Sequence, residues 1–352
     1  MKKILVTGVT GQDGANMVEY LLKNTDHEIV GMIRRSSNLN LFNCREFKDH
    51  KRFKFEYGDL SDTQSINQII DKVKPDYFIN FAANSFVGCS WQMPEQVFEV
   101  NALGTLRCLE AIRKTKPSCR FYSAGSSEEW GDVDYSPQDI NHPIKPRSPY
   151  GASKASARHL VKVYRESYDL FAIHGILFNH EGTKRGEEFV TRKITKNVAR
   201  IYNSINNKQE FQPLELGNVD SKRDWSDSED FVVGVWKMIN QEKPKDYILA
   251  SDETHSIREF VEKAFQRAGI EGVWHGKGLK EQYSVTNEYA KEKNISSSVL
   301  VQINEDFYRP AEVELLLGDS RLAREELEWK PEVSFEQLVN KMVDFDIENL
   351  EK

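Results

Sequence analysis

The amino-acid sequence predicts an α/β fold, with a doubly wound parallel sheet in its first half and a smaller C-terminal α/β region. Two observations carry this prediction. Short apolar runs alternate with helical stretches of crossover length, and a glycine-rich turn follows the first run. Strands that alternate with such helices form parallel sheets with helices on both faces.

The elements of the first half follow in a regular order. Each strand is an apolar run bounded by polar or glycine residues, and each helix repeats apolar residues at helical spacing, as Met17, Val18 and Leu21 do. The predicted strands span 2–7, 28–33, 53–57, 76–83, 120–124 and 171–178, and the predicted helices span 15–23, 65–73, 95–114 and 150–168.

Beyond Phe178 the alternation stops. We expect a Rossmann-type domain in 1–178, to which 226–252 returns, and a substrate-binding domain over most of 179–352. In this second half the pattern predicts helices at 190–201, 230–239, 257–268, 312–317 and 335–350, a strand at 247–250, and polar loops at 203–209 and 296–298.

Composition excludes several classes of protein. A chain of 352 residues with 39% hydrophobic and 11% aromatic residues can bury a large core, so it is not a disordered protein. The net charge of −7 comes without a basic tract, which argues against nucleic acid as a partner. No apolar run reaches the roughly 18 residues of a membrane span, and no signal sequence precedes the first strand. We therefore expect a cytoplasmic protein without a membrane partner.

The four cysteines do not suggest a disulfide or a metal site. Cys44, Cys89, Cys108 and Cys119 show neither CxxC pairing nor the spacing of metal fingers. We expect them to be reduced packing residues and predict no metal.

A glycine-rich turn separates the first strand from the first helix. Three glycines recur at three-residue spacing, which allows a tight turn and a close approach of backbone to a pyrophosphate at the helix N-terminus. The flanking strand and helix give the motif the context that it requires. The turn is therefore expected to bind a dinucleotide cofactor through Gly8, Thr10, Gly11, Gln12, Asp13 and Gly14.

The end of the second strand favours NADP over NAD. NAD sites usually carry an acidic residue there for the ribose hydroxyls. This chain instead has Arg34 and Arg35, whose guanidinium groups could pair with the extra phosphate of NADP, and Ser36 and Ser37 could add hydroxyl donors. The alternative is that these arginines belong to a solvated loop.

Two further strand ends complete the expected cofactor site. Asp59 and Leu60 follow the third strand, where the adenine is expected. Phe81, Ala82 and Ala83 end the fourth strand, and the small alanine side chains would let backbone lie close to the cofactor.

Tyr150 and Lys154 begin a predicted helix and are four residues apart, so they lie on one face. A free phenol has a pKa near 10, but an adjacent ammonium and a cationic nicotinamide would lower it. The pair could therefore act as the base for an alcohol or sugar hydroxyl.

The fifth strand ends in Ser126, Ser127 and Glu128, at the edge where such sheets bind ligands. Ser126 is expected to orient the substrate. A carboxylate at Glu128 suits a dehydratase, which must remove a proton next to a ketone. The alternative is that Glu128 caps the following turn.

These features together resemble the GDP-mannose 4,6-dehydratase family, a group of extended short-chain dehydrogenases/reductases. The resemblance covers nearly the whole chain, and its later segments are specific to this enzyme type. It rests on residues 7–14, 34–37, 57–60, 147–152, 175–181, 189–194, 222–225 and 308–313.

The resemblance implies roles for individual residues. It assigns catalysis to Ser126, Glu128, Tyr150 and Lys154. Further cofactor contacts fall to Ser85, His180 and Arg185. A nucleotide-sugar pocket is expected from Asn179, Val190, Lys193, Arg223, Arg309 and Glu312.

The mechanism implied by the resemblance is an internal redox cycle. Tyr150 would deprotonate the sugar O4 while hydride passes from C4 to NADP+. Glu128 would then remove the C5 proton, water would leave from C6, and the hydride would return to C6. Ser127 stands where related dehydratases can carry an acid, so the group that protonates the hydroxide stays open, and Glu128 could serve twice.

Some residues depart from the family pattern. Ser126 replaces a threonine, which keeps the hydroxyl, whereas Asn84, Phe86 and Gln96 differ near the nicotinamide end and leave the exact sugar open. The alternatives are a dehydratase or epimerase acting on another nucleotide sugar such as a GDP-heptose, or an NADP-binding interaction protein that has lost the chemistry. The downstream pathway also stays open.

The resemblance also implies a homo-oligomer. Such enzymes form dimers or tetramers, and the loop at 34–45 is a candidate contact between subunits. The number of subunits stays open.

Overall fold

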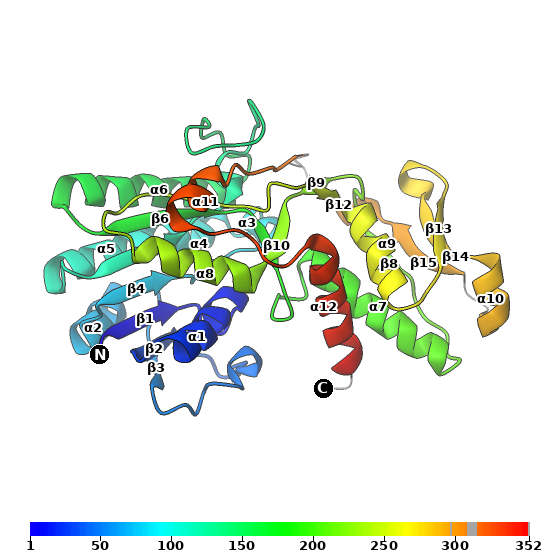
Figure 1. Cartoon of the computed structure of the whole chain (residues 1–352), viewed down its shortest axis with the longest axis horizontal. Coiled ribbons are helices and arrows are strands. Elements are labelled where there is room, and N and C mark those ends of the chain that lie inside the picture. The colour runs from blue at the N-terminus through cyan, green and yellow to red at the C-terminus, as the bar shows by residue number, and fades with distance from the viewer. Residues whose placement is uncertain (296–297, 308–314, 351–352) are drawn as a thin grey trace.

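The structure is a computed structural model that describes residues 1–295, 298–307 and 315–350. Figure 1 shows an elongated molecule with the N-terminal sheet and its helices at one end. At the other end lie α7 (Val190–Asn206), α9 (Ile257–Arg267) and α12 (Phe335–Glu348) beside a smaller sheet.

The central sheet confirms the predicted doubly wound fold. All its strands are parallel, and their order changes direction around β1. From edge to edge the seven strands are β11 (Ile248–Leu249), β6 (Ala172–Leu177), β5 (Arg120–Ala124), β4 (Tyr77–Asn80), β1 (Lys3–Thr7), β2 (Glu28–Ile33) and β3 (Phe53–Tyr57).

The register of the sheet brings the strand ends together. Thr7 at the end of β1 is level with Asn80 of β4, which is level with Ser123 of β5. Ser123 in turn is level with His174 of β6. The segments that follow these four strands therefore leave the sheet at the same edge, where ligands bind in this class of fold.

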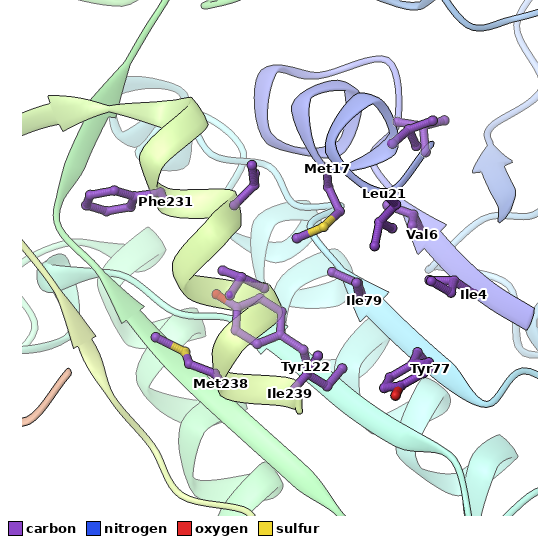
Figure 2. Packing of buried hydrophobic residues seen from close by; sticks show 14 of the residues in the cluster. Ile4, Val6, Met17, Leu21, Tyr77, Ile79, Tyr122, Phe231, Met238 and Ile239 are labelled. Atoms are coloured by element: carbon purple, nitrogen blue, oxygen red, sulfur yellow. The ribbon is translucent and has the colours of Figure 1, made fainter. Parts of the chain in front are cut away.

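Helices cover both faces of the sheet because its strands are apolar on both sides. Figure 2 shows α1 (Gln12–Asn24) and α8 (Ser228–Ile239) packed over one face. The labelled side chains of this buried cluster are Ile4, Val6, Met17, Leu21, Tyr77, Ile79, Tyr122, Phe231, Met238 and Ile239.

The side chains that alternate with these along the strands point to the opposite face of the sheet and are buried there. Leu5 of β1, Phe78 of β4 and Phe121 of β5 are buried there among apolar residues of three helices. These helices are α2 (Thr63–Val73), α5 (Gly104–Thr115) and α6 (Pro149–Tyr168).

A second core lies among α7, α9, α12 and a small sheet. This sheet was not predicted, because its strands have only three to five residues. Two of its three strand pairings are antiparallel, and the third, between β15 and β8, is parallel and joins segments far apart in the sequence. Its order is β13 (Gly272–His275), β14 (Gln282–Val285), β15 (Val299–Ile303) and β8 (Leu214–Leu216). The domain boundaries at 1–178 and 179–352 stay a prediction.

Two further pairs of short strands form outside the central sheet. The parallel pair is β7 (Asn179–Glu181) with β10 (Trp225–Asp227), and the antiparallel pair is β9 (Lys222–Arg223) with β12 (His255–Ser256). The remaining short helices are α3 (Val87–Ser90), α10 (Asn287–Lys293) and α11 (Arg321–Leu327).

The helix predicted at 95–114 is interrupted. It consists of α4 (Pro94–Phe98), a π-helical turn at Glu99–Leu103, and α5. Inside this turn, Asn101 donates to the hydroxyl of Ser153 over 3.0 Å and accepts the backbone N–H of Asn84 over 2.9 Å. The wider turn thus directs a buried amide toward α6 and the end of β4.

Two other predictions of secondary structure were wrong. The helix predicted at 190–201 continues to Asn206, inside the predicted loop at 203–209, because Ile205 is buried in the second core. The described part of the helix predicted at 312–317 is not helical, since Leu315 instead bridges to Lys222 and the Leu317 carbonyl accepts the backbone N–H of Gln138.

A search of the described residues finds no helix with the length and apolar character needed to cross a membrane.

A largely buried ion pair connects α6 to the segment before β11. Arg165 donates to both carboxylate oxygens of Asp246, over 2.6 and 3.1 Å, and the backbone N–H of His174 donates to the same carboxylate over 2.9 Å. Burial raises the pKa of Asp246, but the guanidinium of Arg165 outweighs this effect and holds the pKa below its ordinary value.

We predict that Asp246→Ala lowers the free energy of unfolding by about 3 kcal/mol, because it leaves the Arg165 charge unpaired in a desolvated position. Urea denaturation monitored by circular dichroism measures this loss. The matched control is Lys245→Ala, which removes an exposed pair with Glu326 and should cost less than about 1 kcal/mol. Equal losses in the two variants would contradict the prediction.

Candidate active site

A cavity of about 1820 Å³ runs along the edge of the central sheet where the strands end. It extends from the turn after β1 to α7 and the residues around β9. The predicted site residues that line it are Gly8, Thr10, Gly11, Gln12, Asp13, Gly14, Arg34, Asp59, Leu60, Phe81, Ala82, Ala83, Ser85, Ser126, Glu128, Tyr150, Lys154, Asn179, His180, Arg185, Val190, Lys193 and Arg223.

Three predicted cofactor residues do not line this cavity. Arg35, Ser36 and Ser37 are exposed outside it, and the Ser36 hydroxyl donates to the Asn38 carbonyl over 3.1 Å. Two predicted substrate residues, Arg309 and Glu312, lie outside the described residues.

In the glycine turn, the backbone after β1 lies close to the backbone after β4. Gly8 has φ +70°, and a Cβ there would lie 2.9 Å from the Ala82 nitrogen. A Cβ on Gly14 would lie 2.3 Å from the Gly8 carbonyl oxygen. Because no side chain fits at either position, the backbone faces the cavity with the N-terminus of α1, whose partial positive charge suits a pyrophosphate.

Asp13 and His180 join the glycine turn to β7. The Nδ1 of His180 lies 2.7 Å from the Phe178 carbonyl, and its Nε2 lies 2.9 Å from the Asp13 carboxylate. Both neighbours accept, so the imidazole must donate from both nitrogens and carries a positive charge.

The pKa values of this pair agree with an ion pair. Burial opposes both charges, but the Asp13 carboxylate raises the pKa of His180 above its ordinary value. In turn, the charge of His180 outweighs the effect of burial on Asp13 and lowers the pKa of that carboxyl to about 2.

Tyr150 and Lys154 lie on the first turns of α6, as their spacing predicts. The Ser148 hydroxyl caps the helix by accepting the Gly151 N–H over 3.0 Å, and Pro149 occupies the first turn. Lys154 donates to the Ala124 carbonyl over 2.7 Å, and its Nζ lies 5.9 Å from the centre of the Tyr150 ring.

The protein environment by itself does not ionise Tyr150. Burial raises the pKa of its phenol, and the carboxylates of Glu128 and Glu129 raise it further, whereas a hydrogen bond from Ser126 opposes them. Burial also lowers the pKa of Lys154 to about 8. Tyr150 is therefore neutral near pH 7 unless a further positive charge enters the cavity.

Ser126 and Glu128 lie on a 3-10 turn that follows β5. The Ser126 hydroxyl accepts the backbone N–H of Glu128 over 3.3 Å, and hydrogen bonding by the Ser126 side chain lowers the pKa of the Tyr150 phenol. Glu128 lines the cavity, and its charge acts on the Tyr150 phenol. The cap of this turn is Ser126, so the alternative role of Glu128 as a capping residue is not what the structure shows.

The other half of the cavity carries cations and amides. Lys193 of α7 is half-buried, with its Nζ 3.6 Å from the centre of the Phe307 ring, and Arg223 of β9 is buried. The Oδ1 atom of Asn179 is buried and accepts no hydrogen bond from the described residues. Val190 begins α7 beside them. The set fits an anionic ligand with polar substituents.

Aromatic residues line the region between the two halves, and the sequence analysis did not assign them a role. The guanidinium of Arg185 lies 3.6 Å from the centre of the Phe189 ring, and Phe189 packs edge-on against Phe86 at 5.7 Å. Trp91 also lines the cavity. Only the departure of Phe86 from the family pattern marked this region in the sequence.

Across the described residues, no group of histidine, cysteine, aspartate and glutamate side chains could hold a metal ion.

Comparison with protein families identifies this arrangement. The family model of GDP-mannose 4,6 dehydratase matches residues 5–342. The chain belongs to the GDP-mannose 4,6 dehydratase family. The resemblance inferred from the sequence motifs is thereby confirmed.

Individual relatives match over most of their length. The chain is 45% identical over 359 residues to the GDP-mannose 4,6 dehydratase of Drosophila melanogaster. This match covers 100% of this chain and 87% of the relative. It is 41% identical over 352 residues to the Homo sapiens protein of the same name, with 98% and 91% covered.

A solved structure shows the same fold. The dTDP-glucose 4,6-dehydratase of Bacillus anthracis, in complex with NAD, superposes with a TM-score of 0.80 at 20% sequence identity. The match covers 100% of this chain and 98% of that chain.

We predict that His180→Asn destabilises the protein most at mildly acidic pH. The raised pKa of His180 means that its contribution is complete below about pH 6.5 and is lost as the pH rises through the folded-state pKa. The contribution of Asp13 is present above about pH 4 and is lost as the pH falls toward 2. Urea denaturation at pH 5.5 should show a loss of about 2 kcal/mol, and a smaller loss at pH 9.

Asp13→Asn provides the control, because it removes the same ion pair from the other side. At pH 9, Asp13→Asn should lower the free energy of unfolding by the same small amount as His180→Asn does at that pH. A loss from His180→Asn that is equal at the two pH values would show that the imidazole is not held in its charged form.

Proposed function

We propose that this protein is a nucleotide-sugar 4,6-dehydratase that converts GDP-mannose into GDP-4-dehydro-6-deoxymannose and water. The observation that carries the proposal is the meeting of Ser126, Glu128, Tyr150 and Lys154 in one cavity that also holds the glycine turn. Membership of the family supports the choice of GDP-mannose. Homodimers or homotetramers and a cytoplasmic location stay predictions.

The cavity fits a nicotinamide dinucleotide. At Gly8 and Gly14 the absence of a side chain leaves space for the dinucleotide next to the backbone, which a Cβ would fill. Arg34 directly follows β2, where the adenosine ribose of NADP would carry its extra phosphate. His180 and Lys154 lie further along the cavity. Bound there, the nicotinamide would accept hydride from sugar C4 and return it to C6, so that no net oxidation occurs.

Tyr150 is the base for the hydroxyl at sugar C4 in this proposal. Its phenol is neutral in the protein alone. The hydrogen bond from Ser126 and the charge of Arg185 lower its pKa. A cationic ring bound nearby would favour the phenolate further, and the Lys154 ammonium lies 5.9 Å from the centre of the Tyr150 ring. Ser126 therefore has two roles, because its hydroxyl contacts Tyr150 and is placed to orient the same substrate oxygen.

Glu128 distinguishes dehydration from simple oxidation. A ketone at C4 acidifies the C5 proton, and the Glu128 carboxylate is the cavity group next to Tyr150 that can remove it. Hydroxide leaves C6 and takes up that proton to form water, and the proton held by Tyr150 passes to C5 as C6 is reduced. An epimerase that works by hydride transfer needs no such carboxylate.

Anionic and polar parts of the substrate would face the second half of the cavity. Lys193 and Arg223 supply positive charge for a diphosphate, and the free Oδ1 of Asn179 can accept a hydrogen bond. Roles for Arg309 and Glu312 rest on the family resemblance.

We expect purified protein, given GDP-mannose and a catalytic amount of NADP+, to form a product lighter by one water without accumulation of NADPH. Mass spectrometry and absorbance at the nicotinamide wavelength measure the two quantities. Glu128→Gln should reduce product by at least about 100-fold, because it removes the C5 base. Tyr150→Phe should block C4 oxidation as well.

The two variants separate the steps of the reaction. Glu128→Gln should still reduce a stoichiometric amount of cofactor, whereas Tyr150→Phe should not. Unchanged GDP-mannose with wild-type protein that binds NADP+ would contradict the substrate, and a GDP-heptose would then be tested.

We also predict that Arg34 selects NADP over NAD. Arg34→Ala should weaken NADP+ binding by about tenfold or more and leave NAD+ binding unchanged, because only the extra phosphate is lost as a partner. Arg35→Ala is the matched control, since Arg35 does not line the cavity. Isothermal titration calorimetry measures both cofactors, and equal effects of the two variants would contradict this assignment.

A further inference from the structure

A charged residue without an assigned role lies directly beneath the proposed catalytic groups. Glu129 follows Glu128 on the 3-10 turn, but it does not line the cavity and is fully buried, with 0% exposed. Its Oε1 accepts the backbone N–H of Ser126 over 2.8 Å and lies 2.8 Å from Nε2 of His174. The Oε2 atom is buried and has no hydrogen-bond partner in the part of the chain that the structure describes.

Glu129 has His174 as its close partner at 2.8 Å and a guanidinium at a longer distance. The guanidinium is that of Arg158 of α6, whose NH1 lies 4.0 Å from Oε2 and has no hydrogen-bond partner among the described residues either. His174 of β6 is 0% exposed. A buried carboxylate that keeps an oxygen unsatisfied costs stability, so its retention calls for a role other than packing.

We propose that Glu129 is a positioning residue, whose buried carboxylate holds the backbone of Ser126 and whose negative charge acts on the neighbouring catalytic pair Tyr150 and Lys154. This inference rests on the proposed function, because it assigns Glu129 to the same site. Its geometric basis is the hydrogen bond to Ser126 N–H, which anchors the backbone of the residue whose hydroxyl meets Tyr150.

The charge of Glu129 reaches both catalytic groups. Burial lowers the pKa of Lys154, and Glu129 is the larger of the two carboxylates that oppose this, the other being Asp13. The pKa of Tyr150 is raised by burial first, then by Glu128 and Glu129, and is lowered by Arg185. Loss of the Glu129 charge should therefore lower the pKa of both Lys154 and Tyr150.

The surrounding charged groups keep Glu129 ionised. Burial raises its pKa, but the charge and hydrogen bond of His174, the charge of Arg158 and the Ser126 N–H together lower it below the ordinary value. Behind His174 lies the carboxylate of Asp246, which Arg165 pairs. The titratable and charged groups facing this cluster are Asp13, Tyr122, Glu128, Tyr150, Lys154, Arg158, Arg165, His174, Arg185 and Asp246.

The first test is the pH dependence of kcat in wild-type protein and Glu129→Gln. Both limbs of the profile should move to lower pH by about half a unit or more, since one negative charge is lost near both groups. Glu129→Asp retains the charge and should restore the position of the profile even where kcat falls. Reduced kcat in Glu129→Gln with an unmoved profile would overturn the proposal.

A matched control removes a carboxylate of α5 that contacts the C-terminal part of α6. Glu110 accepts a hydrogen bond from Tyr164 of α6 over 2.7 Å. The groups whose charges shift the pKa values of Lys154 and Tyr150 are Asp13, Glu128, Glu129 and Arg185, and Glu110 does not belong to this set. Glu110→Gln should leave the pH profile in place.

A second measurement does not depend on turnover. Lysine labelled with 13C at Cε reports the titration of Lys154, and Lys154→Arg assigns its signal. The titration midpoint in Glu129→Gln should be lower than in wild-type protein, and an unchanged midpoint would overturn the inference. Failure of wild-type protein to consume GDP-mannose would instead contradict the proposed function and leave this measurement valid.

If Glu129→Gln does not fold, Glu129→Leu with His174→Leu removes both polar groups together, a replacement that buried ion pairs often tolerate. The lysine measurement is then made on that protein. A Lys154 midpoint equal to that of wild-type protein would again overturn the proposal.

Discussion

The parallel pairing of β1, β4, β5 and β6 is the constraint on which the site depends. Parallel strands in register end at one edge, so chain segments that are far apart in sequence leave the sheet side by side. The Thr7 hydroxyl secures this edge, because it donates to Asn80 over 2.6 Å and accepts the Ala82 N–H over 3.0 Å. Without this register, the glycine turn and the proposed catalytic groups would not share a cavity.

Burial of charge is the second determinant of the site. Asp13 with His180 and Glu181 with Arg185 form pairs at its wall, the latter with 3.0 Å between Nε and Oε2. Lys154 donates to a backbone carbonyl, and the buried Glu129 carboxylate lies 2.8 Å from His174 and 4.0 Å from Arg158. Because folding already sets these charges and dipoles in place, they need little rearrangement when charge develops in a bound substrate.

Sequence reasoning succeeded where local chemistry is periodic or depends on a motif. It located the helix that carries Tyr150 and Lys154, because apolar and polar residues repeat at helical spacing there. It missed the sheet of β8, β13, β14 and β15, whose strands have only three to five residues and no sustained pattern. It also placed a loop at 203–209, but residues 203–206 belong to α7, because burial of Ile205 in the second core overrides the polar composition.

By itself, the sequence determined the parallel α/β fold, the glycine turn and the four-residue spacing of Tyr150 and Lys154, since backbone geometry fixes each of these locally. Only the tertiary structure decided that Arg34 lines the cavity and Arg35 does not. It also brought Glu129 to His174, 45 residues away, and Asp13 to His180, 167 residues away. Nothing in the local pattern marks such partners, because their contact depends on which strands pair and how the helices pack upon them.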